Sequence, residues 1–81
     1  MSPKTPRNVS STNLIKVLTK YGYEVIRQKG SHIRLSKTTA ESTYNLTIPN
    51  HDPLKLGTLS SILSEAAEHL KIDKDELIEK L

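Results

Sequence analysis

The sequence predicts an α+β domain in which a helix, three antiparallel strands, a second helix and a short terminal helix follow one another. Apolar residues recur every three or four positions in two stretches, residues 14–21 and 59–70, as on one face of a helix. Between them, apolar and polar residues alternate in short segments bounded by turn-forming residues. The connections are short, which favours an antiparallel meander covered by helices on one side.

The 81 residues suffice for a single domain, which we assign to residues 10–81. Residues 1–9 contain two prolines, two basic residues and no apolar period, so we expect a flexible arm there. No apolar stretch approaches the roughly 18 residues of a membrane span, and the N-terminus lacks the apolar centre of a signal peptide. The sequence has no cysteine, which excludes disulfides and thiolate metal sites. We therefore expect a cytoplasmic protein that contacts no membrane.

The first helix is expected at about Ser11–Tyr21. Its apolar stripe consists of Leu14, Ile15, Leu18 and Tyr21. Ser10 or Ser11 is suited to accept hydrogen bonds from the free amides of the first turn. Gly22 follows where a helix end favours a residue that tolerates positive φ.

Three strands are expected, at Tyr23–Gln28, His32–Ser36 and Tyr44–Ile48. In the second strand Ile33 and Leu35 point to one face, so His32 and Arg34 point to the other, open face of the sheet. The orientation of the first strand stays open at this point. Its two apolar residues are adjacent in the sequence and cannot both face the same way.

The second helix carries the strongest helical pattern. Its apolar positions are Leu59, Ile62, Leu63, Ala66, Ala67 and Leu70. His69 is expected on the exposed side of this helix. Asp73, followed three residues later by Glu76, predicts a capping box at the start of the short terminal helix.

The charges of the chain are unevenly distributed. Residues 1–37 carry eight basic side chains and one acidic side chain, whereas residues 38–81 carry four basic and eight acidic ones. A basic field on one part of a small protein suits a polyanion, and nucleic acid is the first candidate. A basic surface that is merely solvated explains the charge equally well.

The stretch from Arg27 to Arg34 places one histidine, His32, among three cations. Cleavage of an RNA strand without a metal needs a base for the 2′-hydroxyl, cationic or amide donors for the phosphate, and a proton for the leaving oxygen. Histidine suits the proton steps because its ordinary pKa is about 6.5. Lys29 and Arg34 are candidate phosphate contacts, and the backbone amides of Gly30 and Ser31 are further candidates. By itself, however, an exposed strand histidine is more often an ordinary surface residue.

Two later positions are weaker candidates for contacts with RNA. His51 can protonate the leaving oxygen or hold a phosphate, but a loop histidine beside a turn-forming aspartate is the commoner situation. Lys55 precedes Gly57 and Thr58 at the start of the second helix, where free amides favour phosphate and where Thr58 can equally serve as an ordinary cap. The spacing of histidines and aspartates supports no metal site.

Over roughly Asn13–Leu70 the chain resembles a known family of small proteins. The matching elements are the stripe Leu14, Ile15 and Leu18, the pair Gly22-Tyr23, the segment Arg27-Gln28-Lys29-Gly30-Ser31-His32, the strand end Ile48-Pro49 followed by His51, and Leu56-Gly57-Thr58-Leu59 running into Ile62-Leu63. These elements are similar to those of the HicA (YcfA-like) toxins of HicA/HicB toxin–antitoxin systems. The resemblance implies a fold like that of the double-stranded-RNA-binding domain and mRNA cleavage without a cofactor. It also implies that His32 is the catalytic histidine and that a HicB-like antitoxin is the partner.

Two other functions compatible with the sequence differ in what they require of His32. In a non-catalytic RNA-binding module of the same fold, His32 is one contact among several and RNA is recognised through its shape. In a pure interaction protein, the basic face docks an acidic partner. Competition by RNA at moderate salt separates this last function from the other two, because phosphate contacts depend strongly on salt.

Overall fold

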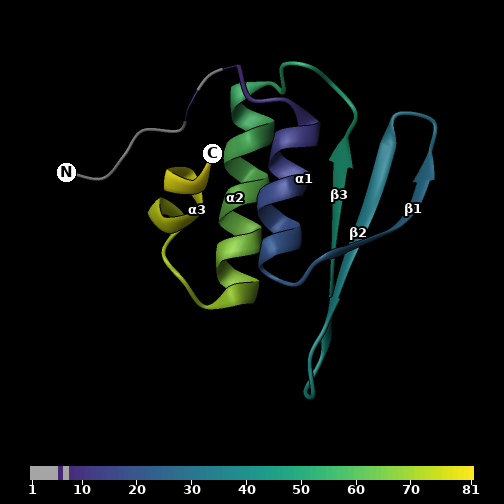
Figure 1. Ribbon diagram of the computed structural model, residues 1–81, viewed down its shortest axis with the longest axis vertical. Helices are drawn as coiled ribbons and strands as arrows, with labels where there is room; N and C mark the ends of the chain where they lie inside the picture. The colour runs from purple at the N-terminus through teal and green to yellow at the C-terminus, as the bar shows by residue number, and fades with distance from the viewer. Residues whose placement is uncertain (1–5, 7) are drawn as a thin grey trace.

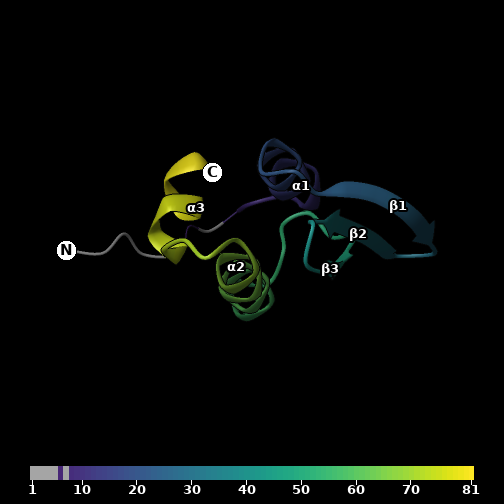
Figure 2. The ribbon, with the colours of Figure 1, turned by 90° about the horizontal axis from the view of Figure 1, so that it is seen from below.

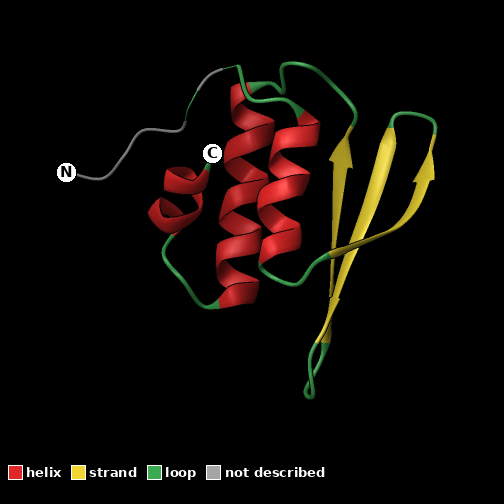
Figure 3. Ribbon diagram, viewed as in Figure 1, coloured by secondary structure: helices red, strands yellow, loops and turns green. Residues whose placement is uncertain are grey.

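The computed structural model describes residues 6 and 8–81. The elements, in chain order, are α1 (Ser11–Lys20), β1 (Glu24–Lys29), β2 (His32–Thr38), β3 (Thr43–Pro49), α2 (Leu56–Leu70) and α3 (Lys74–Lys80) (Figures 1 and 3). The predicted α+β class and the predicted order of elements are confirmed. Residues 1–5 and 7 of the expected arm lie outside the described residues. None of the helices in the described part of the chain is long and apolar enough to cross a membrane.

The elements form three layers. The strands make one antiparallel sheet in the order β1-β2-β3. Helices α1 and α2 lie side by side against one face of this sheet, and α3 lies on the far side of the helices (Figure 2). The core between these layers includes Leu14, Leu18, Tyr23, Leu35, Ile48, Leu59, Leu63 and Leu77, each almost fully buried. Val9, at the end of the expected arm, also lies in this core, and its carbonyl oxygen accepts a hydrogen bond from the Leu54 amide.

Strand β2 shows the alternation that the sequence predicts. Ile33 and Leu35 are buried under the helices, whereas His32 and Arg34 are exposed on the opposite face. Leu46 and Ile48 of β3 continue the buried surface, because they are the cross-strand partners of Leu35 and Ile33. The face assigned to His32 from the sequence is therefore confirmed.

Strand β1 differs from the other two strands because it buries none of its six residues. It pairs with β2 from Val25, opposite Leu35, to Lys29, opposite His32, with a register shift between Val25 and Arg27. The residue at the shift, Ile26, is the extra residue of a β-bulge. Figures 1 and 2 show the reason for the exposure: β1 lies at the outer side of the sheet and runs away from the helices.

Both ends of α1 are capped by polar groups. The hydroxyl of Ser10 accepts a hydrogen bond from the Asn13 amide at 3.1 Å, as predicted for one of the two serines. After the helix, Gly22 adopts φ +101°, the conformation expected of glycine at a helix end. The Lys37 ammonium donates to the Tyr21 carbonyl at 2.6 Å and occupies the space that a Cβ at position 22 would need. The backbone conformation therefore favours glycine, and a side chain at this position would also displace the Lys37 ammonium from the Tyr21 carbonyl.

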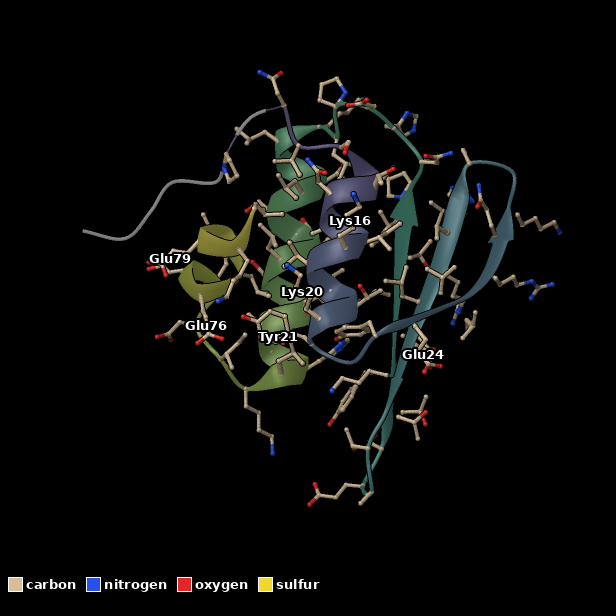
Figure 4. The ribbon with its side chains drawn as sticks, viewed as in Figure 1. Lys16, Lys20, Tyr21, Glu24, Glu76 and Glu79 are labelled. Atoms are coloured by element: carbon tan, nitrogen blue, oxygen red, sulfur yellow. The ribbon has the colours of Figure 1, made fainter. Side chains whose placement is uncertain are left out.

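Helix α3 packs on its own domain. Leu77 is fully buried, and the Tyr21 hydroxyl donates to a Glu76 carboxylate oxygen at 3.0 Å (Figure 4). The Glu76 carboxylate adds to the effect of burial in raising the pKa of Tyr21. The predicted capping box is wrong: the side chain of Asp73 accepts no hydrogen bond, and the Glu76 amide donates to the Asp73 backbone oxygen instead. The Glu76 carboxylate is bound to Tyr21, a contact between distant parts of the chain that local sequence does not reveal.

Candidate nucleic-acid interface

A shallow depression of about 260 Å³ lies on the open face of the sheet. It is lined by Arg27, Lys29, His32, Arg34 and Thr47, which come from all three strands. No acidic side chain is among these lining residues. The sequence-predicted residues Lys29, His32 and Arg34 are thus brought together on one surface.

The bulge at Ile26 determines which residues of β1 reach this surface. Arg27 is the cross-strand partner of Arg34, and Lys29 is the partner of His32, so each pair shares the open face. In a strand with regular alternation from Val25 onward, positions 27 and 29 would lie on the same face as Val25, the side of the sheet opposite to His32. The extra residue shifts the alternation by one and turns both cations towards His32.

Two residues of the depression, Arg27 and Thr47, were not predicted as site residues from the sequence. Regular alternation could not assign Arg27 a face, because the two apolar residues before it are adjacent in the sequence. Thr47 is the partner of Arg34 on β3. Alternation with Leu46 and Ile48 places it on the open face, but a threonine there does not by itself indicate a site. The adjacent apolar pair was the sequence signal for the bulge, and therefore for Arg27.

Like charges face each other across the depression. Arg27 is directly opposite Arg34, an arrangement that destabilises an antiparallel pair by up to about 1 kcal/mol. Lys29 is opposite His32, so protonation of the imidazole would add a second like-charged pair. A bound anion relieves this repulsion, because it supplies the negative charge that the lining residues lack. The depression is therefore suited to a phosphate group.

A two-residue hairpin turn sets the edge of the site next to His32. Gly30 adopts φ +58° with no atom near its missing Cβ, so its backbone conformation and not a lack of space favours glycine. The Ser31 carbonyl oxygen accepts a hydrogen bond from the Asn50 amide at 2.6 Å, which joins the turn to the segment after β3. Pro49 lies opposite His32 in the ladder. The hydrogen bond from Asn50 therefore holds the turn in place directly before His32, the first residue of β2.

His51 and Lys55 do not line the depression. His51 is exposed in the segment after β3, where its backbone carbonyl accepts from the Ser11 amide at 3.2 Å. Since the neighbouring Asn50 is bonded to Ser31, the segment that carries His51 is held at the His32 end of the sheet. Lys55 is exposed immediately before α2, and its side chain makes no capping hydrogen bond.

The expectation that His69 is a surface residue is wrong. Its ring is stacked on Tyr44, with centroids 4.6 Å apart, and its Nδ1 lies 2.9 Å from the hydroxyl of the buried Tyr23. Burial raises the pKa of Tyr23 to about 12, and the Glu65 carboxylate and Tyr44 add to this effect. The helical pattern predicted an exposed position, but the end of the β2–β3 hairpin covers it. We refer to Tyr23, Tyr44 and His69 as the aromatic cluster.

Within the described residues, no group of three or more histidine, aspartate or glutamate side chains is arranged to hold a metal ion. The lining of the depression offers one imidazole, cationic groups and a hydroxyl. This set of donors suits an anion and proton transfer.

The fold and the depression define a small α+β domain that presents a cationic sheet surface with one exposed histidine. The model of a protein family described as "HicA toxin of bacterial toxin-antitoxin" matches residues 11–67. The chain therefore belongs to the HicA toxin family, as its sequence resemblance implied. No curated protein and no solved structure matches the chain.

Proposed function

We propose that the chain is an endoribonuclease that cleaves mRNA, with His32 as its catalytic residue. Membership of a toxin family supports a role as the toxin of a toxin–antitoxin system. The observation that carries it is the depression itself, in which one exposed imidazole is surrounded by Arg27, Lys29 and Arg34 with no acidic counter-charge in the lining.

The chemistry begins at the 2′-hydroxyl of the nucleotide that precedes the scissile bond. His32 takes the proton of this hydroxyl, and the 2′-oxygen attacks the adjacent phosphorus. The bond between phosphorus and the 5′-oxygen breaks, which leaves a 2′,3′-cyclic phosphate on one fragment. Arg27, Lys29 and Arg34 stabilise the negative charge that develops on the phosphate oxygens.

The departing 5′-oxygen needs a proton, and His51 is our candidate donor. It is exposed on a segment bonded to the hairpin turn beside His32. The Gly30-Ser31 turn is proposed to meet the phosphate with its backbone amides, and Lys55 to contact a neighbouring phosphate of the strand. These contacts use only groups of the protein and no cofactor.

A HicB-type antitoxin is the proposed protein partner, since the family belongs to toxin–antitoxin systems. A toxin with an exposed active surface is restrained most directly by covering that surface. We therefore propose that the antitoxin closes the depression around His32.

The test is incubation of a labelled RNA with purified wild-type protein and His32→Ala in EDTA, with His51→Ala in parallel. Lys16→Ala is a matched control, because Lys16 is an exposed cation on α1, away from the depression (Figure 4). We expect the wild type and Lys16→Ala to cut the RNA and leave a 2′,3′-cyclic phosphate. His32→Ala should bind the RNA without cutting it.

Other outcomes reject parts of the proposal. If neither the wild type nor His32→Ala cuts the RNA while both bind it, the chain is a non-catalytic RNA-binding module. If both cut equally, His32 is not the base, and the His51→Ala result decides whether that histidine is. If neither protein binds RNA at low salt, the basic face serves a protein partner alone.

A further inference from the structure

Two large apolar side chains are exposed next to each other on β1. Val25 is 49% exposed and Ile26 is 55% exposed, and the only other large apolar residue of the described chain with comparable exposure is Leu56, at the start of α2. Single exposed apolar residues are common on protein surfaces and need no explanation. Two adjacent ones on a strand that buries nothing have no role in the core of this domain.

The position of this pair points to contact with another molecule. Within the described residues, β1 forms one edge of the sheet and has no strand on its outer side. The bulge at Ile26 and the cations that follow it oppose indiscriminate pairing with another strand. A partner is therefore recognised chiefly by its side chains. An apolar surface of the partner would remove Val25 and Ile26 from water, which is energetically favourable.

The surroundings of the pair indicate the chemistry of that partner. Arg27 and Lys29 follow directly along the strand and lie on the open face with His32. RNA can neutralise these cations, but it has no aliphatic surface with which to cover Val25 and Ile26. A second copy of the chain that paired symmetrically through its own β1 would bring a second set of cations, because Arg27 and Lys29 of both copies would meet. A protein surface with apolar and acidic side chains satisfies both features.

We infer that the outer edge of the sheet is a docking surface for an acidic protein partner that wraps around β1. The partner contacts Val25 on the helix-side face, Ile26 at the bulge, and Arg27 and Lys29 on the open face. Apolar side chains of the partner cover Val25 and Ile26, and its carboxylates pair with Arg27 and Lys29. Because these two cations also line the depression, a partner seated on β1 extends over the mouth of the candidate active site. The inference rests on the antitoxin proposed above and names the surface to which it binds.

The experiment uses the complex of the full chain with its HicB-type antitoxin, prepared by co-expression. Val25→Thr/Ile26→Thr removes the apolar surface but keeps two β-branched residues in the strand. Leu56→Thr is the matched control, because it removes an exposed apolar residue at another site. We expect the dissociation constant to rise at least about tenfold for the double variant and to stay within about twofold for Leu56→Thr. In the wild-type complex, hydrogen exchange of the amides of residues 24–29 should be slowed.

The readouts separate this inference from the proposed catalysis. The free double variant should cleave RNA at the wild-type rate, since neither residue lines the depression, and the antitoxin should inhibit it only at higher concentration. An inactive wild-type chain that still shows slowed exchange over residues 24–29 rejects the nuclease and leaves the docking surface standing. The inference is overturned if the double variant binds the antitoxin as tightly as the wild type, if no complex forms, or if the apolar pair mediates self-association instead.

Discussion

A histidine lies at each end of the β2–β3 pair: His32 begins β2 at one end, and His69 of α2 packs against the hairpin at the other. The surroundings of the two residues differ. His69 packs against the hairpin end: its ring is stacked on Tyr44, lies within hydrogen-bond distance of the Tyr23 hydroxyl, and faces the Glu65 carboxylate at 3.9 Å. His32, at the opposite end, is exposed on the open face among Arg27, Lys29 and Arg34. Contacts that fix a ring stabilise the fold. An exposed ring beside unneutralised cations contributes little to packing and is free to meet a substrate.

The largest expected effect distinguishes these two histidines by activity. His32→Gln should lower the rate of RNA cleavage by at least about 100-fold, because general acid–base catalysis is worth roughly 10²- to 10⁴-fold. His69→Gln should leave the rate within about twofold at a temperature where the variant is folded. Initial rates on a labelled RNA, with circular dichroism as the test of folding, measure both. Equal losses in the two variants would contradict the division of roles.

The free energy of unfolding should depend more on His69 than on His32, the reverse of the order expected for activity. His69→Ala removes the hydrogen-bond partner of the buried Tyr23 hydroxyl and the ring that stacks on Tyr44, and we expect it to lower the free energy of unfolding by about 1–3 kcal/mol. His32→Ala should change that free energy by less than about 0.5 kcal/mol, since the side chain is exposed. Urea denaturation followed by circular dichroism gives both values. A larger loss in His32→Ala than in His69→Ala would mean that the ring of His32, and not that of His69, contributes to the stability of the fold.

Sequence alone predicted the open-face site better than the aromatic cluster, for a physical reason. His32 and Arg34 follow a strict alternation with buried Ile33 and Leu35, so a local rule gives their orientation. The contacts of His69 join α2 to Tyr23, just before β1, and to Tyr44 of β3, both far away in the sequence. No periodicity within the helix reveals them.

Strand β1 is an intermediate case between these two regions. The sequence located the strand and showed a conflict at Val25 and Ile26, but only the pairing with β2 reveals that a bulge resolves it. The faces of Arg27 and Lys29 could not be predicted for that reason. The adjacent apolar pair signals an irregularity in the strand, but only the pairing shows that Ile26 is the extra residue and that Arg27 and Lys29 therefore turn to the open face.

The cations of the depression should lower the stability of the fold and raise its affinity for RNA, whereas the aromatic cluster should contribute to stability alone. Arg27→Gln relieves the repulsion from Arg34, so the free energy of unfolding should rise by about 0.2–1 kcal/mol. RNA binding should weaken, and the slope of log affinity against log salt should fall by about 0.7, the value for one phosphate contact on a single strand. Fluorescence anisotropy over a series of salt concentrations measures the slope. Lys16→Gln, on α1, should leave it unchanged, and an equal change there would mean that the charge effect is not local to the depression.

The smallest expected effect concerns the phenol of Tyr23, whose hydroxyl is hydrogen-bonded to His69. Burial raises the pKa of Tyr23 from its ordinary value of 10.0 to about 12, so between these values the folded protein keeps a proton that the unfolded chain releases. The contribution of Tyr23 to stability is therefore complete below about pH 10 and declines as the pH rises towards about 12. The difference in unfolding free energy between wild type and Tyr23→Phe should shrink over this range, as measured by urea denaturation at several pH values. A difference that does not change with pH would mean that the phenol of Tyr23 ionises equally readily in the folded and unfolded chains, and that burial does not protect its bond to His69.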